Sequence, residues 1–142
     1  MPLNKNIKGN ELVKVNGRYQ SKYFHDAGKV FEELNKVSPS FCLAKWHQLT
    51  LYLQNGFNHS CHHPSPHKVS LSELETNYKA LHNTQYKKQQ MQKMLDGERP
   101  SECDYCWKAE DAGHISDRVY KSASAWAKIN FESVIELSLI HI

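Results

Sequence analysis

The sequence predicts a small α+β fold, in which a short β-hairpin is followed by two helices and by a turn that holds a CxxC motif. Between residues 48 and 53, leucines alternate with polar side chains, which is the period of a strand with one buried face. Apolar residues at helical spacing follow Ser70 and again Thr84. All four cysteines lie between residues 42 and 106, so we expect them to serve one site within this fold.

Composition limits the class of protein. The chain has 142 residues, and 18 Lys and Arg against 15 Asp and Glu give a net charge of +3, which is too small an excess to indicate a nucleic-acid partner. No apolar run approaches the roughly 20 residues needed to cross a bilayer, and the N-terminus lacks the apolar core of a signal peptide. We therefore expect a cytoplasmic protein without a membrane partner, whose cysteines stay reduced and act as metal ligands.

Residues 1–40 are expected to form an N-terminal extension with one short helix. Asn16-Gly17 predicts a tight turn between two short extended pieces. Asp26 is a candidate N-cap for the helix, which should end at Ser38-Pro39. The apolar side chains expected on one face of this helix are Val30, Phe31, Leu34 and Val37.

The predicted hairpin lies between Cys42 and Cys61. Asn55-Gly56 supplies the positive φ angles of a two-residue turn, and the return strand places His59 on the same face as Cys61. The buried face of the first strand is expected to carry Leu49, Leu51 and Leu53. If residues 43–47 extended this strand, Cys42 would lie far from Cys61, so this segment has to fold back. The segment HHPSPHK after Cys61 is expected to be a loop because of its prolines.

Two helices are expected between the hairpin and the CxxC motif. Ser70 and Glu73 form a capping box that opens the first helix. The second runs from about Thr84 to Asp96, and Gly97 and Pro100 stop it. The side chains expected to face inward are Leu71, Leu74, Tyr78 and Leu81 in the first helix and Met91, Met94 and Leu95 in the second. The lysines and glutamines between them are expected to form a solvated face.

Four cysteines are enough to close a tetrahedral zinc site or to hold one iron–sulfur cluster. Cys103-x-x-Cys106 lets one tight turn aim two sulfurs at a common centre. A thioredoxin-like dithiol is disfavoured, because no hydrophobic strand precedes this motif. Cys42 and Cys61 alone would be interpreted as small buried apolar residues, but beside a CxxC pair they are predicted ligands. Structural zinc sites typically use two CxxC-like pairs, whereas Cys42 and Cys61 are single cysteines with 18 residues between them. The spacing therefore favours a cluster over zinc.

Histidines surround Cys61, at positions His59, His62, His63 and His67. Imidazole is a good zinc ligand, so a mixed Cys/His zinc site stays an alternative. A histidine-proline loop preorganises a site poorly, so we expect His62, His63 and His67 to be exposed to solvent. The position of His59 is left open, because it shares a strand face with Cys61.

The cysteine spacing is CX13GX4C from Cys42 through Gly56 to Cys61, followed by CX2C at Cys103 and Cys106. It resembles the spacing of the SPASM and twitch auxiliary-cluster domains of radical SAM enzymes. Two flanking segments also resemble this family: FCxxxW at 41–46, with Lys45 where proline is common, and MLDGERPSECDYCW at 94–107. The resemblance covers residues 41–121. It implies one auxiliary [4Fe–4S] cluster on the ligand set Cys42, Cys61, Cys103 and Cys106.

The chain departs from the full SPASM pattern, because no cysteine follows Cys106, and it lacks the CX3CX2C motif of the radical SAM core. A twitch-like domain with one cluster is therefore the better match. The resemblance implies that residues 122–142 are a linker and the first strand of a core that is cut short; whether 137–142 belong to the natural chain is left open. The missing core is then the expected partner, together with a peptide or small-molecule substrate.

It follows from the resemblance that S-adenosylmethionine is bound only by the full-length parent, and that this fragment is inactive as an enzyme by itself. A structural zinc module for nucleic-acid or protein interaction stays open as an alternative with the same four thiols. Its candidate basic side chains are Lys79, Lys87, Lys88, Lys93 and Arg99, although their interleaving with glutamine is more typical of a solvated helix face. A structural fragment without metal is a third alternative. The sequence identifies neither the substrate nor the reaction of the parent enzyme.

Overall fold

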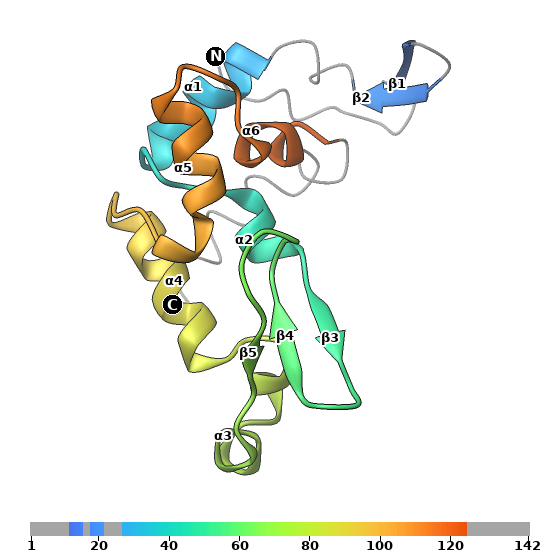
Figure 1. Ribbon diagram of the computed structural model, residues 1–142, viewed down its shortest axis with the longest axis vertical. Helices are drawn as coiled ribbons and strands as arrows, with labels where there is room; N and C mark the ends of the chain where they lie inside the picture. The colour runs from blue at the N-terminus through green and yellow to red at the C-terminus, as the bar shows by residue number, and fades with distance from the viewer. Residues whose placement is uncertain (1–11, 16–17, 22–26, 125–142) are drawn as a thin grey trace.

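Figure 1 shows the computed structural model of the chain, which describes residues 12–15, 18–21 and 27–124. The fold is α+β, as the sequence predicts. The helices are α1 (Ala27–Val37), α2 (Leu43–His47), α3 (Leu71–Thr76), α4 (Gln85–Leu95), α5 (Asp104–Asp111) and α6 (Asp117–Ser122), with 3-10 turns η2 (Tyr78–Leu81) and η3 (Ser101–Cys103). The strands are β1 (Leu12–Val15), β2 (Arg18–Ser21), β3 (Thr50–Tyr52), β4 (Phe57–His59) and β5 (His67–Lys68).

Strands β1 and β2 pair in an antiparallel ribbon, as expected for the segment around Asn16-Gly17, with Val15 opposite Arg18. The two turn residues themselves lie outside the described residues, and so do the expected cap Asp26 and the expected C-terminal strand. Helices α1, α5 and α6 gather at one end of the molecule, and the sheet β3-β4-β5 and α3 lie at the other, with α2 between them (Figure 1). Within the described ranges, no helix has the length and apolar character needed to span a bilayer.

The hydrophobic core of the helical end lies between α1, α2 and α6. Val30 and Leu34 of α1 are buried, as predicted, and so are Leu43 of α2 and Val119 of α6. Phe31 differs from the prediction, because its side chain is 39% exposed. It lies beneath the guanidinium of Arg118, 5.4 Å from the ring centre, at the edge of the core rather than inside it.

Arg118 connects the helices around this core. Its guanidinium is almost fully buried and forms an ion pair with Glu110 of α5, in which Nε donates to Oε1 at 2.7 Å and Nη2 to Oε2 at 3.1 Å. Nη1 also donates to the backbone oxygen of Phe41, and Nη2 to Oδ1 of Asn35 on α1. One side chain of α6 thus fixes α5, α1 and the segment that enters α2.

The three-stranded sheet differs from the predicted hairpin in three respects. Tyr52 pairs with Phe57, so four residues form the loop instead of two, and Gly56 takes the positive φ of 73°. Leu53 lies in this loop and is 79% exposed rather than buried. The segment HHPSPHK is not all loop, because β5 within it pairs with β4, where His67 stands opposite Asn58.

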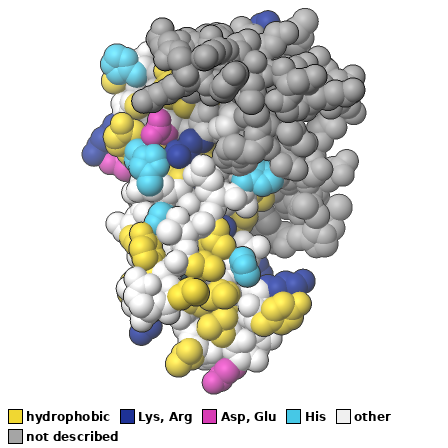
Figure 2. All heavy atoms as spheres, turned by 90° about the vertical axis from the view of Figure 1, so that its right-hand side faces the viewer, with side chains coloured by type: hydrophobic (Ala, Val, Ile, Leu, Met, Phe, Trp, Pro, Cys, Tyr) yellow, Lys and Arg dark blue, Asp and Glu magenta, His cyan; other side chains and the backbone are white. Residues whose placement is uncertain are grey.

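The first predicted helix is divided. Ser70 caps α3 by accepting a hydrogen bond from the backbone N–H of Glu73, as predicted. Asn77 is extended, with φ −151° and ψ 101°, and its side chain caps η2 through the N–H of Lys79. This break changes which residues face inward, so that Leu71 and Tyr78 are 77% and 79% exposed. Leu53, Leu71 and Tyr78 are thus largely exposed at this end of the molecule, and Figure 2 shows hydrophobic side chains gathered in the lower part of one face.

Helix α4 begins after the cap Thr84 and ends before Asp96, as predicted, and it buries Met91 and Met94. The expectation of a fully solvated polar face is wrong, because Lys87 and Gln90 are also buried. Burial lowers the pKa of Lys87 to about 8, and its Nζ lies 3.4 Å from the backbone oxygen of His82. Helix α4 therefore contacts the rest of the molecule on a wider face than its apolar residues indicate.

Replacing Arg118 by methionine should lower the free energy of unfolding by about 3–5 kcal/mol, because it leaves the buried Glu110 carboxylate without its counter-charge. Arg99→Met is the matched control. Arg99 pairs with Asp111 across exposed side chains, so its loss should cost at most about 1 kcal/mol. Urea denaturation measures both, and equal effects of the two substitutions would contradict this account of Arg118.

Candidate metal centre

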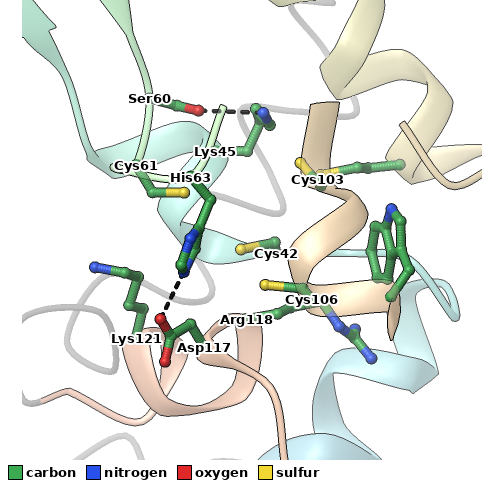
Figure 3. Close-up of a pocket in the computed structure, with 12 residues that line it drawn as sticks. Cys42, Lys45, Ser60, Cys61, His63, Cys103, Cys106, Asp117, Arg118 and Lys121 are labelled. Atoms are coloured by element: carbon green, nitrogen blue, oxygen red, sulfur yellow. Dashed lines mark hydrogen bonds and ion pairs between the residues drawn. The ribbon is translucent and has the colours of Figure 1, made fainter. Parts of the chain in front are cut away.

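All four cysteines line one cavity between α2, the end of the sheet and α5. Cys42 is the N-cap of α2, Cys61 follows β4, Cys103 ends η3 and Cys106 lies in the first turn of α5. Figure 3 shows their sulfur atoms pointing toward a common space from three separate segments of the chain. The cysteines are all free thiols. The structure thus brings together the four residues that the sequence selects.

Helix α2 explains how Cys42 reaches the others. Five extended residues would cover roughly 16 Å, whereas five helical residues rise only about 7.5 Å. Residues 43–47 form this helix directly after Cys42, which is extended at φ −140° and ψ 119°. The predicted fold-back of the segment is therefore confirmed, and its form is a short helix whose Leu43 and Ala44 are buried.

The CxxC pair is held by packing around Trp107. Its indole is buried and donates from Nε1 to the backbone oxygen of Pro100 at 2.8 Å, across the turn η3. Trp107 and Met94 of α4 belong to the same buried cluster as Cys42, Cys103 and Cys106. The cavity therefore has a mainly apolar wall beside the sulfurs.

Burial raises the pKa of three of the thiols, those of Cys42, Cys103 and Cys106, in the absence of a bound cation. It raises the pKa of Cys103 to about 12 and that of Cys106 to about 11. It also raises the pKa of Cys42, with a further contribution from the nearby Cys61. A metal ion that bound to these sulfurs would displace their protons, because cysteine binds a metal as the thiolate.

N–H groups point at the sulfurs. The backbone N–H groups of Ala44 and Lys45 donate to the sulfur of Cys42, and the backbone N–H of Arg118 donates to that of Cys106. The ammonium of Lys45 donates to the sulfur of Cys103. Such donors stabilise a thiolate far more than a neutral thiol, and they are the usual surroundings of metal-bound cysteine.

Lys45 ties the segments of the site together. Its side chain is 2% exposed, and Nζ donates to Oγ of Ser60 at 3.1 Å and to Oε1 of Glu102 at 2.5 Å. Ser60 directly precedes Cys61, and Glu102 directly precedes Cys103. Burial acts to lower the pKa of Lys45, but the neighbouring Glu102 carboxylate and Cys103 raise it overall, so the ammonium stays charged.

The histidines depart from the prediction. His62 is exposed, as expected, but His63 is largely buried and lines the cavity beside Asp117. His67 is partly buried as well, because β5 carries it to Oγ1 of Thr84, 2.6 Å from its Nε2. His59 is buried but turns away from the cavity, toward the hydroxyl of Tyr52 and the backbone oxygen of Cys61.

Three residues of the site were missed by sequence reasoning: Lys45, Asp117 and Arg118 line the same cavity as the cysteines. Lys45 and Arg118 are almost fully buried, although charged residues are usually exposed. Asp117 and Arg118 lie more than ten residues beyond Cys106 in sequence. A local pattern therefore holds no indication of their role.

No protein-family model matches the chain, and no curated protein or solved structure matches it either. The resemblance to SPASM and twitch domains thus depends on the cysteine pattern and its flanking residues.

Lys45→Met should lower the free energy of unfolding by about 3–5 kcal/mol, because the mostly buried Glu102 carboxylate loses its partner. Lys108→Met removes a lysine from an exposed i,i+4 pair with Asp104 and should have no measurable effect. Urea denaturation of both variants and wild type gives the comparison. An unchanged stability of Lys45→Met would show that Lys45 does not hold the site together.

Proposed function

We propose that Cys42, Cys61, Cys103 and Cys106 bind one [4Fe–4S] cluster, and that residues 41–121 act as a twitch-like auxiliary-cluster domain of a radical SAM enzyme. The observation that carries this proposal is the meeting of all four thiols at one cavity. A four-cysteine set is the usual ligand set of such a cluster. Its protein surroundings should be apolar and should supply N–H donors to sulfur, as found here.

The arrangement of elements supports the same proposal. A β-hairpin, the helical segments α3, η2 and α4, and a CxxC turn follow one another along the chain, which is the order that the resemblance implies. The first thiol enters from the helix before the hairpin, the second leaves the return strand, and the last two come from the turn η3 and α5. A cluster on these sulfurs would add a further link between the three segments, beside the contacts of Lys45 with Ser60 and Glu102.

The sulfur spacing favours a cluster over a single zinc ion. A tetrahedral zinc with Zn–S bonds of 2.3 Å holds its sulfurs about 3.8 Å apart. Among the described residues, no three of the cysteine sulfurs lie within 4.8 Å of one another. A cluster with a separate iron for each cysteine fits this wider spacing better.

Ligation also explains the site better than inert burial. Buried free cysteines are common as small apolar side chains, but such residues need no charged partner. Here Lys45 reaches the sulfur of Cys103, and a backbone N–H reaches that of Cys106. These donors lie where negative charge would develop on the sulfurs when the cysteines lose their protons and bind a metal.

A zinc module that binds nucleic acid is less well supported. Lys87 is one of the basic side chains that such a surface would use, but it is buried and its pKa is lowered to about 8. Phosphate binding needs exposed positive charge, which the buried Lys87 does not supply.

The proposed role is electron transfer or anchoring of a peptide or small-molecule substrate in a cytoplasmic enzyme. The radical chemistry on S-adenosylmethionine would belong to the core domain of the parent, because that chemistry needs a second cluster on a CX3CX2C motif, which this sequence lacks. The core of the same polypeptide is then the natural partner of this domain. Without a CX3CX2C core, residues 41–121 by themselves should not turn over substrate.

Anaerobic reconstitution tests the ligand set. Wild-type protein should hold about four iron and four sulfide per chain, and each of the four Cys→Ser variants should hold less than half of this. Tyr105→Phe is the matched control, since Tyr105 stands inside the CxxC turn and is 60% exposed; it should keep full iron content.

Two outcomes of this reconstitution experiment would contradict the proposed ligand set. Colourless wild-type protein with one zinc per chain and no iron, after synthesis in iron-supplied cells and anaerobic handling, would replace the cluster by a zinc site. Full iron retention in any one Cys→Ser variant would remove that cysteine from the ligand set.

A further inference from the structure

A second group of metal-ligating side chains lies at the edge of the cysteine cavity. His62, His63 and Asp117 each offer one ligand atom, and the three atoms lie within 4.8 Å of one another. The histidines come from the segment after Cys61, and Asp117 is the first residue of α6. The group therefore joins two parts of the chain that are distant in sequence.

The two imidazoles lie close to the same carboxylate oxygen. Nε2 of His63 lies 2.6 Å from Oδ2 of Asp117, and Nε2 of His62 lies 3.7 Å from that oxygen. Ligand atoms around a tetrahedral ion with bonds of 2.0–2.2 Å stand about 3.3–3.6 Å apart. One separation is thus close to that needed, and the other has to widen by less than about 1 Å. A histidine–aspartate hydrogen bond alone explains His63, but it gives no reason for the approach of His62.

The ring of His63 is held in place. It stacks on Tyr105 of α5 at 4.0 Å with an angle of 14° between the planes, and its centre is 3.9 Å from that of the His62 ring. Figure 3 shows His63 and Asp117 facing each other, with the side chain of Lys121 nearby. His62 is exposed, so water or a further ligand has access to the group from solvent.

We propose that His62, His63 and Asp117 bind a divalent transition-metal ion, with Zn²⁺ as the representative ion, at a site separate from the four cysteines. Two imidazoles and one carboxylate are ligands that Zn²⁺ and Fe²⁺ accept while leaving coordination positions open. The donor set is harder than the four thiolates, so the two sites differ in their preferred metal. This proposal stands whether the cysteines hold a cluster or zinc.

Lys121 opposes the binding of a cation, because it lines the same surface pocket as His62 and its charge acts on that imidazole. Removal of this charge should therefore strengthen metal binding. Lys121→Met should therefore raise the affinity for the metal ion, whereas the loss of a ligand should lower it.

The test uses equilibrium dialysis against Zn²⁺ under anaerobic conditions, after the cysteine site has been filled, with metal counted per chain. Wild type should bind one more zinc than His62→Gln and Asp117→Asn at the same free Zn²⁺, and the loss of affinity should be at least about tenfold. Lys121→Met should bind more tightly than wild type. His114→Gln removes an exposed histidine outside the group and should match wild type.

His62→Gln is the decisive variant, because His62 is exposed and its replacement should not disturb folding. Equal zinc content in wild type and His62→Gln would overturn the proposal. So would a loss of the metal at the cysteines in His63→Gln, which would make His63 a ligand of that site instead. If the cysteines bind zinc in place of a cluster, the total rises by one in every variant, but the difference between wild type and His62→Gln persists.

Discussion

The fold-back of the chain at Cys42 is the constraint on which the rest of the structure depends. Helix α2 shortens the path between Cys42 and the sheet, so that one thiol before the strands meets one thiol after them. Phe41, immediately before Cys42, fills the core between α1 and α6, while Ala44 faces the cysteine cluster. The same few residues therefore connect the hydrophobic core to the candidate metal centre.

Two buried ion pairs surround the cavity and fix its walls. Arg118 with Glu110 joins α6 to α5, and Lys45 with Glu102 joins α2 to the CxxC turn. Buried pairs of this kind seldom add net stability over apolar residues, but the loss of one partner is costly. The ammonium of Lys45 acts on the thiol of Cys103, which becomes anionic when a metal binds, so this charge suits a negatively charged centre.

The sequence was most informative where a local rule applies. The cap Ser70, the helix after Thr84 and the positive φ at Gly56 follow from short-range chemistry, and the four cysteines could be selected by count and spacing. Other features depend on long-range packing. Lys87 is buried because of what α4 packs against, His63 is placed by Tyr105 and Asp117, and Asn77 breaks a helix whose spacing looked continuous. None of these contacts is visible in a local pattern.

The central claim is that the four cysteines hold a cluster of several irons. X-ray absorption of anaerobically prepared protein, recorded at the iron and zinc edges, tests this most directly. The account predicts an iron edge with a sulfur shell and a second shell of iron neighbours at short distance. A zinc edge with four sulfur neighbours, and no iron beyond background, would contradict it.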